Sequence, residues 1–470
     1  MRSNALPDIV PQNTTFPARV ESIRALLYSL RWPAAPSLLR HRGNEMIDYR
    51  ELKTRRDEIA KNIADRNMKV DVDEAIRLQD RRAELMKTAE ELRAARNLNA
   101  SKMKGKMDND ARQALVAEGR EIKDRIAATE SELEVVDKDF NTIIRQIPNY
   151  AHPAAPVGKE DKDNTAIKYV GKPPVFGFKP LDHVQLGEKL DLIDFETGTK
   201  VSGPKFYYLK NEAVLLQMAL ENYAMNIVLK HGFTPFITPD VAKEEILEGI
   251  GFNPRGAESN IYTVEGTGTA LVGTAEITLG GYYSGETLDK SRLPIRMTGL
   301  SHCFRREAGG AGQFSKGLYR VHQFSKLEMF VICLPEDSDR LHEEILAIEE
   351  EIFSGLGLAY RVVDTCTGDL GAPAYRKFDI EAWMPGRGEE GEYGEVTSTS
   401  NCTDYQSRNL NVRYKDDDGK SKFVHMLNGT AVALSRAVVA VMENYQQADG
   451  SIRIPDALVP LMGGRTEIRR

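Results

Sequence analysis

Residues 302–330 read HCFRREAGGAGQFSKGLYRVHQFSKLEMF and decide how the rest of the chain is interpreted. Two β-rich stretches joined by a glycine-rich loop predict a hairpin whose loop is too long for a tight turn. Such a hairpin can hold Arg305 and Arg306 at its base against an anion, with Lys316 and Arg320 in a basic loop above. Taken alone, a surface hairpin with solvated charges is the simpler interpretation, because charged side chains usually face water. The flanking sequence has to decide between the two.

Length and composition limit the class of protein. At 470 residues the chain is too long for one ordinary core, so two domains are expected. Its 41% hydrophobic and 28% charged residues are typical of a soluble globular protein, and no apolar run approaches a membrane span. The net charge of −7 gives no global sign of nucleic-acid binding, so a basic patch would have to be local. The four cysteines are far apart and form no zinc or disulfide pattern, which fits a reducing compartment.

Residues 1–45 form an arginine-rich start with six arginines, no lysine and three acids. Their apolar residues between 23 and 30 fall on one helical face, and such a segment can be an organelle transit peptide. The favoured alternative is an extension that is disordered or not part of the native start, because ordered-looking sequence begins at Met46. We therefore expect a cytoplasmic protein, or an organellar one if residues 1–45 are a transit peptide.

Two long stretches predict a helical hairpin. Residues 72–104 contain no proline or glycine and are rich in helix-forming residues, with leucines every seven positions. Residues 108–147 place apolar side chains at alternating spacings of four and three, the a/d seam of a coiled coil. Gly105 turns the chain, Asp108 is a candidate N-cap and Pro148 ends the second helix. The two helices should pair antiparallel in an arm about 50 Å long. The seam residues are Ile122, Ile126, Thr129, Leu133, Val136, Phe140, Ile143 and Ile147.

The tip and outer half of this arm carry more basic than acidic side chains. A basic rod could follow the phosphate backbone of a nucleic acid. A dimerising coiled coil with a solvated face explains the same pattern equally well from the sequence alone. The basic residues are Arg93, Arg96, Lys102, Lys104, Lys106 and Arg112.

A change of composition after the arm marks a domain boundary. We assign residues 46–150 to the arm, 151–180 to a proline-rich linker that runs into the first strands, and 181–470 to the second domain. In that domain an apolar-faced helix over 214–230 is followed by a short strand over 233–238. This pair could be plain core or a subunit interface, and periodicity does not distinguish them.

The second domain contains many short strands and few helices. Because strands outnumber βαβ units, we expect an α+β fold with a mostly antiparallel β-sheet flanked by helices. The predicted strands lie in 261–300, broken by glycine turns, and at 360–363, 395–402 and 426–430; helices are predicted at 337–353 and at 431–445, the last with Arg436 one turn inside.

Several motifs resemble those of the class II aminoacyl-tRNA synthetases, and of the seryl-tRNA synthetases in particular. FRREAGGAGQFSKGLYRVHQFSKLE (304–328) resembles motif 2, LNGTAVALSRAVVAVMENYQ (427–446) resembles motif 3 and NYAMNIVLKHGFTPFITPDV (222–241) resembles motif 1. GTAE (273–276) and EVTSTSNCTDYQSR (395–408) are similar to the family's serine and ATP segments, and the helical arm is similar to its tRNA-binding domain. The resemblance implies a class II catalytic domain of the standard, zinc-independent type.

The resemblance also implies roles in ATP-dependent activation of serine. Cations are needed on the ATP phosphates, because charge accumulates there when the serine carboxylate attacks the α-phosphate. Arg305 would bind the α-phosphate and the serine carboxylate, Arg436 would reach the γ-phosphate, and Glu395 with Ser398 would hold Mg²⁺ through oxygen. Glu307, the backbone at Val321 and the Phe324 ring would meet the adenine. The implied ATP-binding residues are Arg305, Arg306, Glu307, Val321, Phe324, Glu395, Val396, Thr397, Ser398 and Arg436, with Arg305 and Arg436 catalytic.

Serine is small and polar, so its site must recognise an ammonium and a hydroxyl. A polar site rejects alanine strongly, because buried polar groups would be left unpaired. Singly, each implied residue has an ordinary structural explanation, and the ordered set favours function. The implied serine-binding residues are Thr274, Ala275, Glu276, Glu328, Asn428 and Thr430.

The implied partners are L-serine, ATP, tRNA(Ser), tRNA(Sec) and a second subunit in a homodimer, with no membrane. No residue need act as nucleophile, because the terminal ribose hydroxyl of the tRNA attacks the seryl-adenylate, and the loop at 309–317 is placed to meet the acceptor end. Two alternatives remain open. A paralogue that activates an amino acid for a carrier protein usually lacks the arm. A non-enzymatic RNA-binding homologue would be expected to have lost Arg305, Glu307 or Arg436.

Overall fold

The computed structural model describes residues 49–253, 259–308 and 315–470. The predicted extension at 1–45 and most of the glycines in the loop of the 302–330 hairpin lie outside these residues. Within the described residues, no helix has the length and apolar character needed to cross a bilayer.

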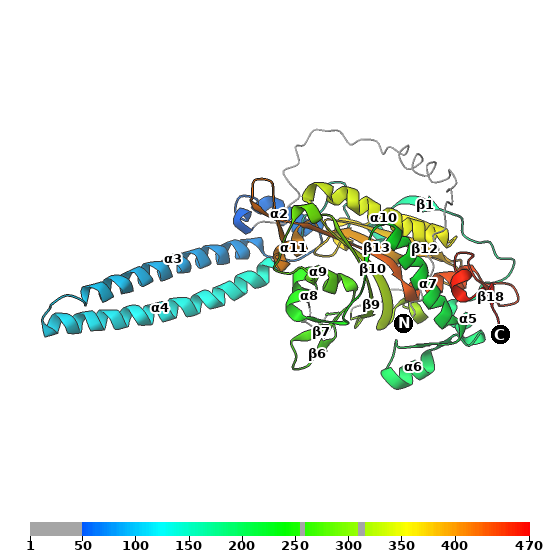
Figure 1. Cartoon of the computed structure of the whole chain (residues 1–470), viewed down its shortest axis with the longest axis horizontal. Coiled ribbons are helices and arrows are strands. Elements are labelled where there is room, and N and C mark those ends of the chain that lie inside the picture. Colours follow the sequence, from blue (N-terminus) through cyan, green and yellow to red (C-terminus); the bar gives the residue numbers. More distant parts are fainter. Residues whose placement is uncertain (1–48, 254–258, 309–314) are drawn as a thin grey trace, which may run out of the picture. The chain divides into compact units, whose positions relative to one another are not determined.

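Helices α3 (Val72–Lys102) and α4 (Asn109–Ile144) form the arm and lie antiparallel, side by side (Figure 1). Each begins at an aspartate whose side chain accepts a main-chain hydrogen bond: Asp71 from Glu74 at 2.9 Å and Asp108 from Ala111 at 2.7 Å. The antiparallel arm and the Asp108 N-cap are therefore confirmed. Helix α4 ends three residues earlier than predicted, because the chain tightens before Pro148 into a turn in which the amides of Gln146 and Ile147 donate to the carbonyls of Ile143 and Ile144, both at 3.1 Å.

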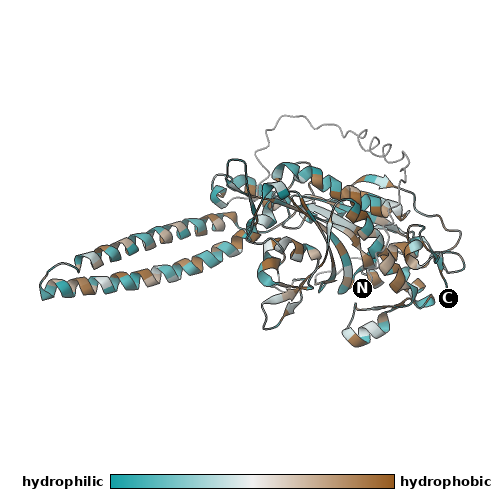
Figure 2. Cartoon of the chain, viewed as in Figure 1, coloured by the Kyte–Doolittle hydropathy of each residue, from teal (hydrophilic) through white to brown (hydrophobic). Residues whose placement is uncertain are grey.

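The seam between the two helices is apolar along most of its length (Figure 2). Leu85 of α3 packs in one cluster with Val136 and Phe140 of α4, and Leu92 packs farther out with Ile122 and Ile126. Nearer the tip the buried residue is Asn99, whose amide donates to the Leu115 carbonyl (3.2 Å) and to Glu118 (2.8 Å). The predicted coiled coil is confirmed, with a polar layer replacing leucine in its outer part.

Hydrogen bonds to main-chain carbonyls join the base of the arm to the second domain. Arg66 follows α2 (Arg56–Asp65), is 2% exposed and donates to the carbonyl oxygens of Asn149 (2.9 Å), Ala374 (3.0 Å) and residues 371–372. Burial lowers the pKa of Arg66 to about 10. The Asn149 amide in turn donates to the Cys402 carbonyl at 3.0 Å. This polar joint links the arm to the loops beside the central sheet.

An eight-stranded sheet forms the centre of the second domain, in the order β1-β11-β12-β13-β16-β10-β9-β4. All neighbouring pairs are antiparallel except β4 and β9, which confirms the predicted α+β class with a mostly antiparallel sheet. The strands are β1 (Thr165–Val170), β4 (Thr234–Ile237), β9 (Ile295–Phe304), β10 (Gln323–Cys333), β11 (Tyr360–Asp364), β12 (Arg376–Met384), β13 (Glu392–Asn401) and β16 (His425–Ala433).

The alternation of side chains along β10 separates the two faces of the sheet. Met329 and Val331 belong to the larger core, which contains residues of the long helices. Phe330 belongs to a second core on the opposite face. Lys326 and Glu328 share the parity of Phe330, so that face changes from apolar to polar toward the base of the hairpin. The larger core includes α7 (Glu212–Lys230), α10 (Ser338–Gly355) and α12 (Leu434–Asn444), and the second core includes α8 (Glu244–Ile250) and α9 (Ala275–Gly281).

Gly429 in β16 allows α10 to approach the sheet closely. A Cβ atom at this position would lie 2.3 Å from Cγ2 of Ile345 and 2.8 Å from Oε1 of Glu349. Neither distance is sterically possible without movement, so the position requires glycine. This contact sets the distance between β16 and α10. Asn428 and Thr430, on either side of Gly429, point to the opposite, polar face of the sheet.

Three further differences from the sequence analysis lie after the arm. Strand β1 lies inside the segment predicted as a linker, where its mostly exposed residues conceal an edge strand. Helix α9 lies in the region predicted to hold only strands and turns; it is seven residues long and rich in glycine. Strand β16 continues to Ala433, so α12 begins at Leu434 rather than at residue 431, and Arg436 lies in its first turn.

Candidate active site

Arg305 lies at the base of the hairpin formed by β9 and β10. Phe304 pairs with Gln323, and the next main-chain amide, that of Arg305, donates to the His322 carbonyl at 2.9 Å. The guanidinium donates from Nε and Nη2 to the Gly273 carbonyl, both at 3.3 Å, and lies 5.4 Å from the centre of the Phe324 ring. The hairpin, the GTAE segment and a cation–π contact therefore fix one arginine in place.

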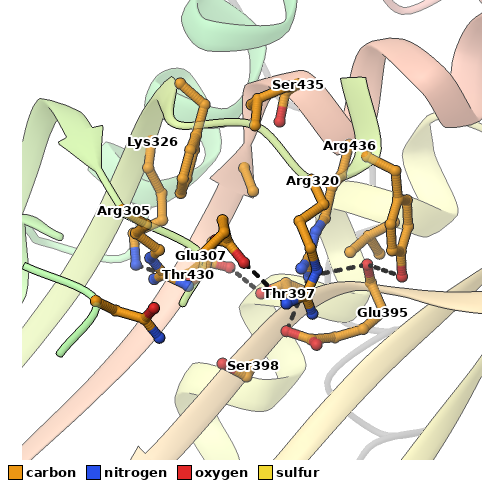
Figure 3. Close-up of a pocket in the computed structure, with 16 residues that line it drawn as sticks. Arg305, Glu307, Arg320, Lys326, Glu395, Thr397, Ser398, Thr430, Ser435 and Arg436 are labelled. Carbon is orange, nitrogen blue, oxygen red and sulfur yellow. Dashed lines mark hydrogen bonds and ion pairs between the residues drawn. The ribbon is translucent and has the colours of Figure 1, made fainter. Parts of the chain in front are cut away.

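A cavity of about 290 Å³ opens beside Arg305 (Figure 3). All of the predicted ATP-binding residues line it except Arg306, and Thr430 of the predicted serine set lines it as well. Four of its lining side chains are cationic, which suits a polyanion. The lining residues that the sequence analysis did not select are Asn260, Tyr319, Arg320, Lys326, Ala433 and Ser435.

Arg436 and Glu395 form an ion pair at one side of the cavity (Figure 3). Nη1 of Arg436 lies 3.0 Å from the Glu395 carboxylate and donates to the Glu395 carbonyl at 3.1 Å. The guanidinium also lies 4.9 Å from the centre of the Tyr319 ring. Burial raises the pKa of Glu395, but Arg436 and then Lys377 outweigh it, so the pKa is held below its ordinary value. Glu395 is therefore ionised at neutral pH.

Glu307 turns the chain sharply at the other side of the cavity. Its φ of 51° lies in the left-handed region, which costs a residue with a side chain about 1 kcal/mol or more. Its carboxylate pairs with Arg320 at 2.8 Å (Figure 3). The strained turn and the ion pair together hold Glu307 against the hairpin.

A β-bulge brings Glu395 and Ser398 onto the same face of β13. Residues three apart normally point to opposite faces of a strand. In the pairing with β12, Thr397 faces Ile380 and Glu395 faces Glu381, so Val396 is the extra residue. All four residues line the cavity, but Val396 and Thr397 are buried, whereas Glu395 and Ser398 are both partly exposed.

Two carboxylates, the buried Glu328 and the partly buried Glu276, lie next to the cavity. Glu328 is 1% exposed and accepts from Lys326 at 2.6 Å and from the Thr430 hydroxyl at 3.1 Å. Glu276 accepts from Gln406 at 2.7 Å and from Asn428 at 2.9 Å. Burial and the neighbouring Glu328 raise the pKa of Glu276 to about 7. Acids and hydroxyls on adjacent elements can recognise a small ligand that carries both an ammonium and a hydroxyl.

Family models match both parts of the chain. Residues 46–151 match the seryl-tRNA synthetase N-terminal domain, and residues 262–445 match the tRNA synthetase class II core domain (G, H, P, S and T). The serine–tRNA ligase of Treponema denticola is 65% identical over 89% of this chain and 99% of its own length. The chain belongs to the seryl-tRNA synthetase family. It is an aminoacyl-tRNA ligase of class II.

Two solved structures from this family superpose on most of the chain. The seryl-tRNA synthetase of Pyrococcus horikoshii complexed with ATP gives a TM-score of 0.81 at 39% identity, covering 90% of this chain and 99% of that one. The cytoplasmic serine–tRNA ligase of Naegleria fowleri in complex with AMP gives 0.77 at 32% identity, covering 91% and 99%. The arm and the sheet described above thus have counterparts in two other seryl-tRNA synthetases.

Some residues implied by the seryl-tRNA synthetase resemblance lie away from the cavity surface. Arg306 is exposed, and its main-chain amide donates to the Asn260 carbonyl at 2.8 Å. Thr274 and Ala275 are buried at the start of α9, where the Thr274 hydroxyl accepts from the Glu276 amide at 3.2 Å. Asn428 reaches Glu276 rather than the cavity. Thr274, Ala275 and Asn428 therefore support Glu276, and Arg306 points to solvent.

The most informative residue that the sequence analysis missed is Lys326. It is 6% exposed, lines the cavity and touches Glu328. Its position two residues before Glu328 in a predicted strand places both side chains on one face, which was a usable signal. Lysine is seldom buried without a partner, so the residue type alone favours an exposed position here.

Within the described part of the chain, no group of three or more histidines, cysteines, aspartates or glutamates could hold a metal ion. Glu395 and Ser398 offer oxygen donors on one face of the cavity. Oxygen donors suit a hard cation such as Mg²⁺, which usually retains several waters and shares the phosphates of its ligand.

The six basic residues predicted to bind tRNA are all exposed on the arm. Arg93 forms an ion pair with Glu130 of α4 at 2.7 Å, so its charge is partly offset. Lys102, Lys104 and Lys106 lie at or just beyond the end of α3, at the turn into α4.

Proposed function

We propose that this chain activates L-serine with ATP and transfers the seryl group to tRNA(Ser). The observation that carries the proposal is the cavity in which Arg305 and Arg436 face the same space, with the carboxylates of the partly buried Glu276 and the buried Glu328 beside it. Cations suit a triphosphate, and buried acids suit an amino acid's ammonium. Two family members have been solved with ATP and AMP.

In the first step a serine carboxylate oxygen bonds to the α-phosphorus, and the bond from that phosphorus to pyrophosphate breaks. Arg305, held by the Gly273 carbonyl, binds the α-phosphate and the serine carboxylate and opposes their repulsion. Arg436 binds the γ-phosphate and stabilises the charge that leaves with pyrophosphate. Phe324 stacks on the adenine, with Glu307 at its edge.

Mg²⁺ would be held by Glu395 and Ser398 and would offset charge on the ATP phosphates. Glu395 suits this role because its lowered pKa keeps it ionised and because the bulge at Val396 turns it toward Ser398.

Glu328 recognises the ammonium of serine and Thr430 its hydroxyl, with Glu276 behind them. Asn428 and Gln406 hold Glu276 in place. Alanine keeps the ammonium but would leave the buried partner of the serine hydroxyl unpaired, which costs about 1–3 kcal/mol. The site therefore selects serine by its hydroxyl.

In the second step the terminal ribose hydroxyl of the tRNA attacks the carbonyl carbon of seryl-adenylate, and AMP leaves. The six basic residues of the arm bind the tRNA backbone. We assign the loop at 309–317, of which residues 309–314 lie outside the described part of the chain, to the acceptor end. From the family resemblance we infer that tRNA(Sec) is a second acceptor.

The same proposal includes a homodimer. Exposed apolar side chains lie on α7 and on the edge strand β4: Val214 is 40% exposed, Met218 54% and Ile237 89%. Such residues at an unpaired sheet edge suit a subunit interface. Residues 1–45 remain assigned to an extension, 46–150 to the arm, 151–180 to a connection that includes β1, and 181–470 to the catalytic domain. The four cysteines are buried and free, which fits a reducing cytoplasm.

ATP–pyrophosphate exchange with each amino acid tests the proposal. Serine should support exchange at least about a hundredfold faster than alanine or glycine, from the unpaired polar groups that these would leave. Exchange with alanine or glycine but not with serine would contradict the proposed specificity. Exchange with serine but no charging of tRNA would favour transfer to a carrier protein instead.

A further inference from the structure

Lys326 lies between the cavity and Glu328. The lysine lines the cavity, whereas Glu328 is 1% exposed and does not line it. Nζ of Lys326 is 2.6 Å from Oε2 of Glu328 and 3.4 Å from the Thr430 hydroxyl. The same Oε2 also accepts from Thr430 at 3.1 Å. The carboxylate that would hold serine is thus already covered by an ammonium.

Lys326 lines the cavity and Glu328 does not, so a ligand ammonium that approaches Glu328 from the cavity meets Lys326 on the Oε2 oxygen. Two cations cannot share one buried carboxylate without strong repulsion, because charges in a weakly polar interior are poorly screened. Lys326 must therefore leave Glu328 when serine binds. Its four-carbon side chain can move into the cavity, on the side where Arg305 lies (Figure 3).

We propose that Lys326 occupies the ammonium site of serine in the free enzyme and, when serine binds, moves to contact the serine carboxylate or the α-phosphate. This inference rests on the proposed function and identifies a further residue that touches the reacting groups. This change of ion-pair partners leaves the net charge of the site balanced. The serine ammonium replaces the lysine ammonium on Glu328, and the serine carboxylate supplies a new partner for the lysine.

The proposal explains why a lysine is buried here. An ion pair buried for stability alone could be replaced by apolar residues with little loss. A resident cation, by contrast, pairs with Glu328 and holds its side chain in position before serine binds. It also makes binding depend on a ligand that brings both charges, because an amine without a carboxylate would displace Lys326 and leave it without an anion.

Serinol, which has the ammonium and hydroxyl of serine but no carboxylate, distinguishes these interactions. In Lys326→Met, no lysine competes for Glu328, so serinol should inhibit ATP–pyrophosphate exchange at least about tenfold more strongly than in the wild type. In the same variant kcat/KM for serine should fall about tenfold or more, because the carboxylate loses a charged partner. Lys210→Met is the control: it removes an ion pair with Asp191 (2.6 Å) on half-exposed side chains and should change neither value.

Lys326→Arg keeps the charge and is the second variant if Lys326→Met does not fold. Its guanidinium can hold Glu328 with two hydrogen bonds, so the KM for serine should rise about tenfold while serinol stays weak. Unchanged or weaker inhibition of a folded Lys326→Met by serinol overturns the proposal, as does an unchanged KM in Lys326→Arg. A wild-type enzyme that gives no exchange with serine would refute the proposed function instead.

Discussion

Replacing Arg436 with alanine should separate binding of ATP from binding of AMP. The change removes the guanidinium that lies 3.0 Å from Glu395 and faces the cavity. A hydrogen bond to a charged group contributes about 1.5–3 kcal/mol, so loss of the γ-phosphate contact should lower kcat/KM for ATP about 10- to 150-fold. AMP has no γ-phosphate, so its inhibition constant should change less than about twofold.

The fold should tolerate this substitution. The Glu395 side chain is 44% exposed, so its carboxylate can be hydrated once Arg436 is absent, and the free energy of unfolding should fall by about 1 kcal/mol. Without Arg436, the effect of burial on Glu395 is less opposed and its pKa should rise. As the pH is lowered, the residual ATP–pyrophosphate exchange of Arg436→Ala should therefore disappear at a higher pH than the exchange of the wild type does.

The assay is ATP–pyrophosphate exchange at varied ATP, with AMP as inhibitor, alongside urea unfolding. Arg453→Ala is the matched control, because Arg453 pairs with Asp456 at the surface, where the two side chains are 57% and 85% exposed. Retained kcat/KM for ATP, or equal weakening of ATP and AMP, would refute the placement of Arg436 at the γ-phosphate.

Three further predictions test the arm, the sheet and the serine site. Replacing residues 90–128 with a short glycine–serine turn keeps the basal cluster around Leu85 and should reduce tRNA charging at least about a hundredfold while exchange stays within about twofold; equal loss of both would make the arm structural. Gly429→Ala should lower the free energy of unfolding by about 1–3 kcal/mol in urea, whereas Gly177→Ala, where nothing lies within 4 Å, should change it by less than about 0.5 kcal/mol. Glu276 has its pKa raised to about 7, so the folded protein binds its proton more tightly than the unfolded chain and loses stability as the pH rises from about 4.5 to 7. Glu276→Gln should remove up to about 3 kcal/mol of that loss in the free energy of unfolding. If the free energy of unfolding of the wild type and of Glu276→Gln instead runs parallel with pH, Glu276 titrates normally.

The long helices could be predicted from the sequence because their signal is local. A seam repeated over several heptads, an aspartate at the start of α4 and a proline after it agree with one another. Helix α9 had no such signal: its seven residues include two glycines, and its cap is a threonine inside a motif assigned to serine. Strand β1 was hidden because an edge strand with mostly exposed residues does not alternate clearly.

The site could be predicted only in part, since its geometry depends on pairing between strands. The family resemblance selected Glu395 and Ser398, but the spacing of three alone would place them on opposite faces. The bulge at Val396 that unites them depends on the register with β12. Lys326 likewise lines the cavity while Glu328 does not, and no local sequence pattern specifies which of the two residues reaches the cavity wall.

The joint at Arg66 has a consequence for divergence among related enzymes. Its acceptors are main-chain carbonyl oxygens, which every residue type supplies, so the side chains at 371, 372 and 374 can change while the joint persists. Within this joint the arginine and Asn149 carry most of the specificity, and the receiving surface adds the hydroxyls of Thr403, which accepts from Asn149 at 3.0 Å, and of Thr367, which donates to the Asp65 carbonyl at 2.6 Å. Arms from different members of the family should therefore be exchangeable at this point if the arginine and the asparagine are kept.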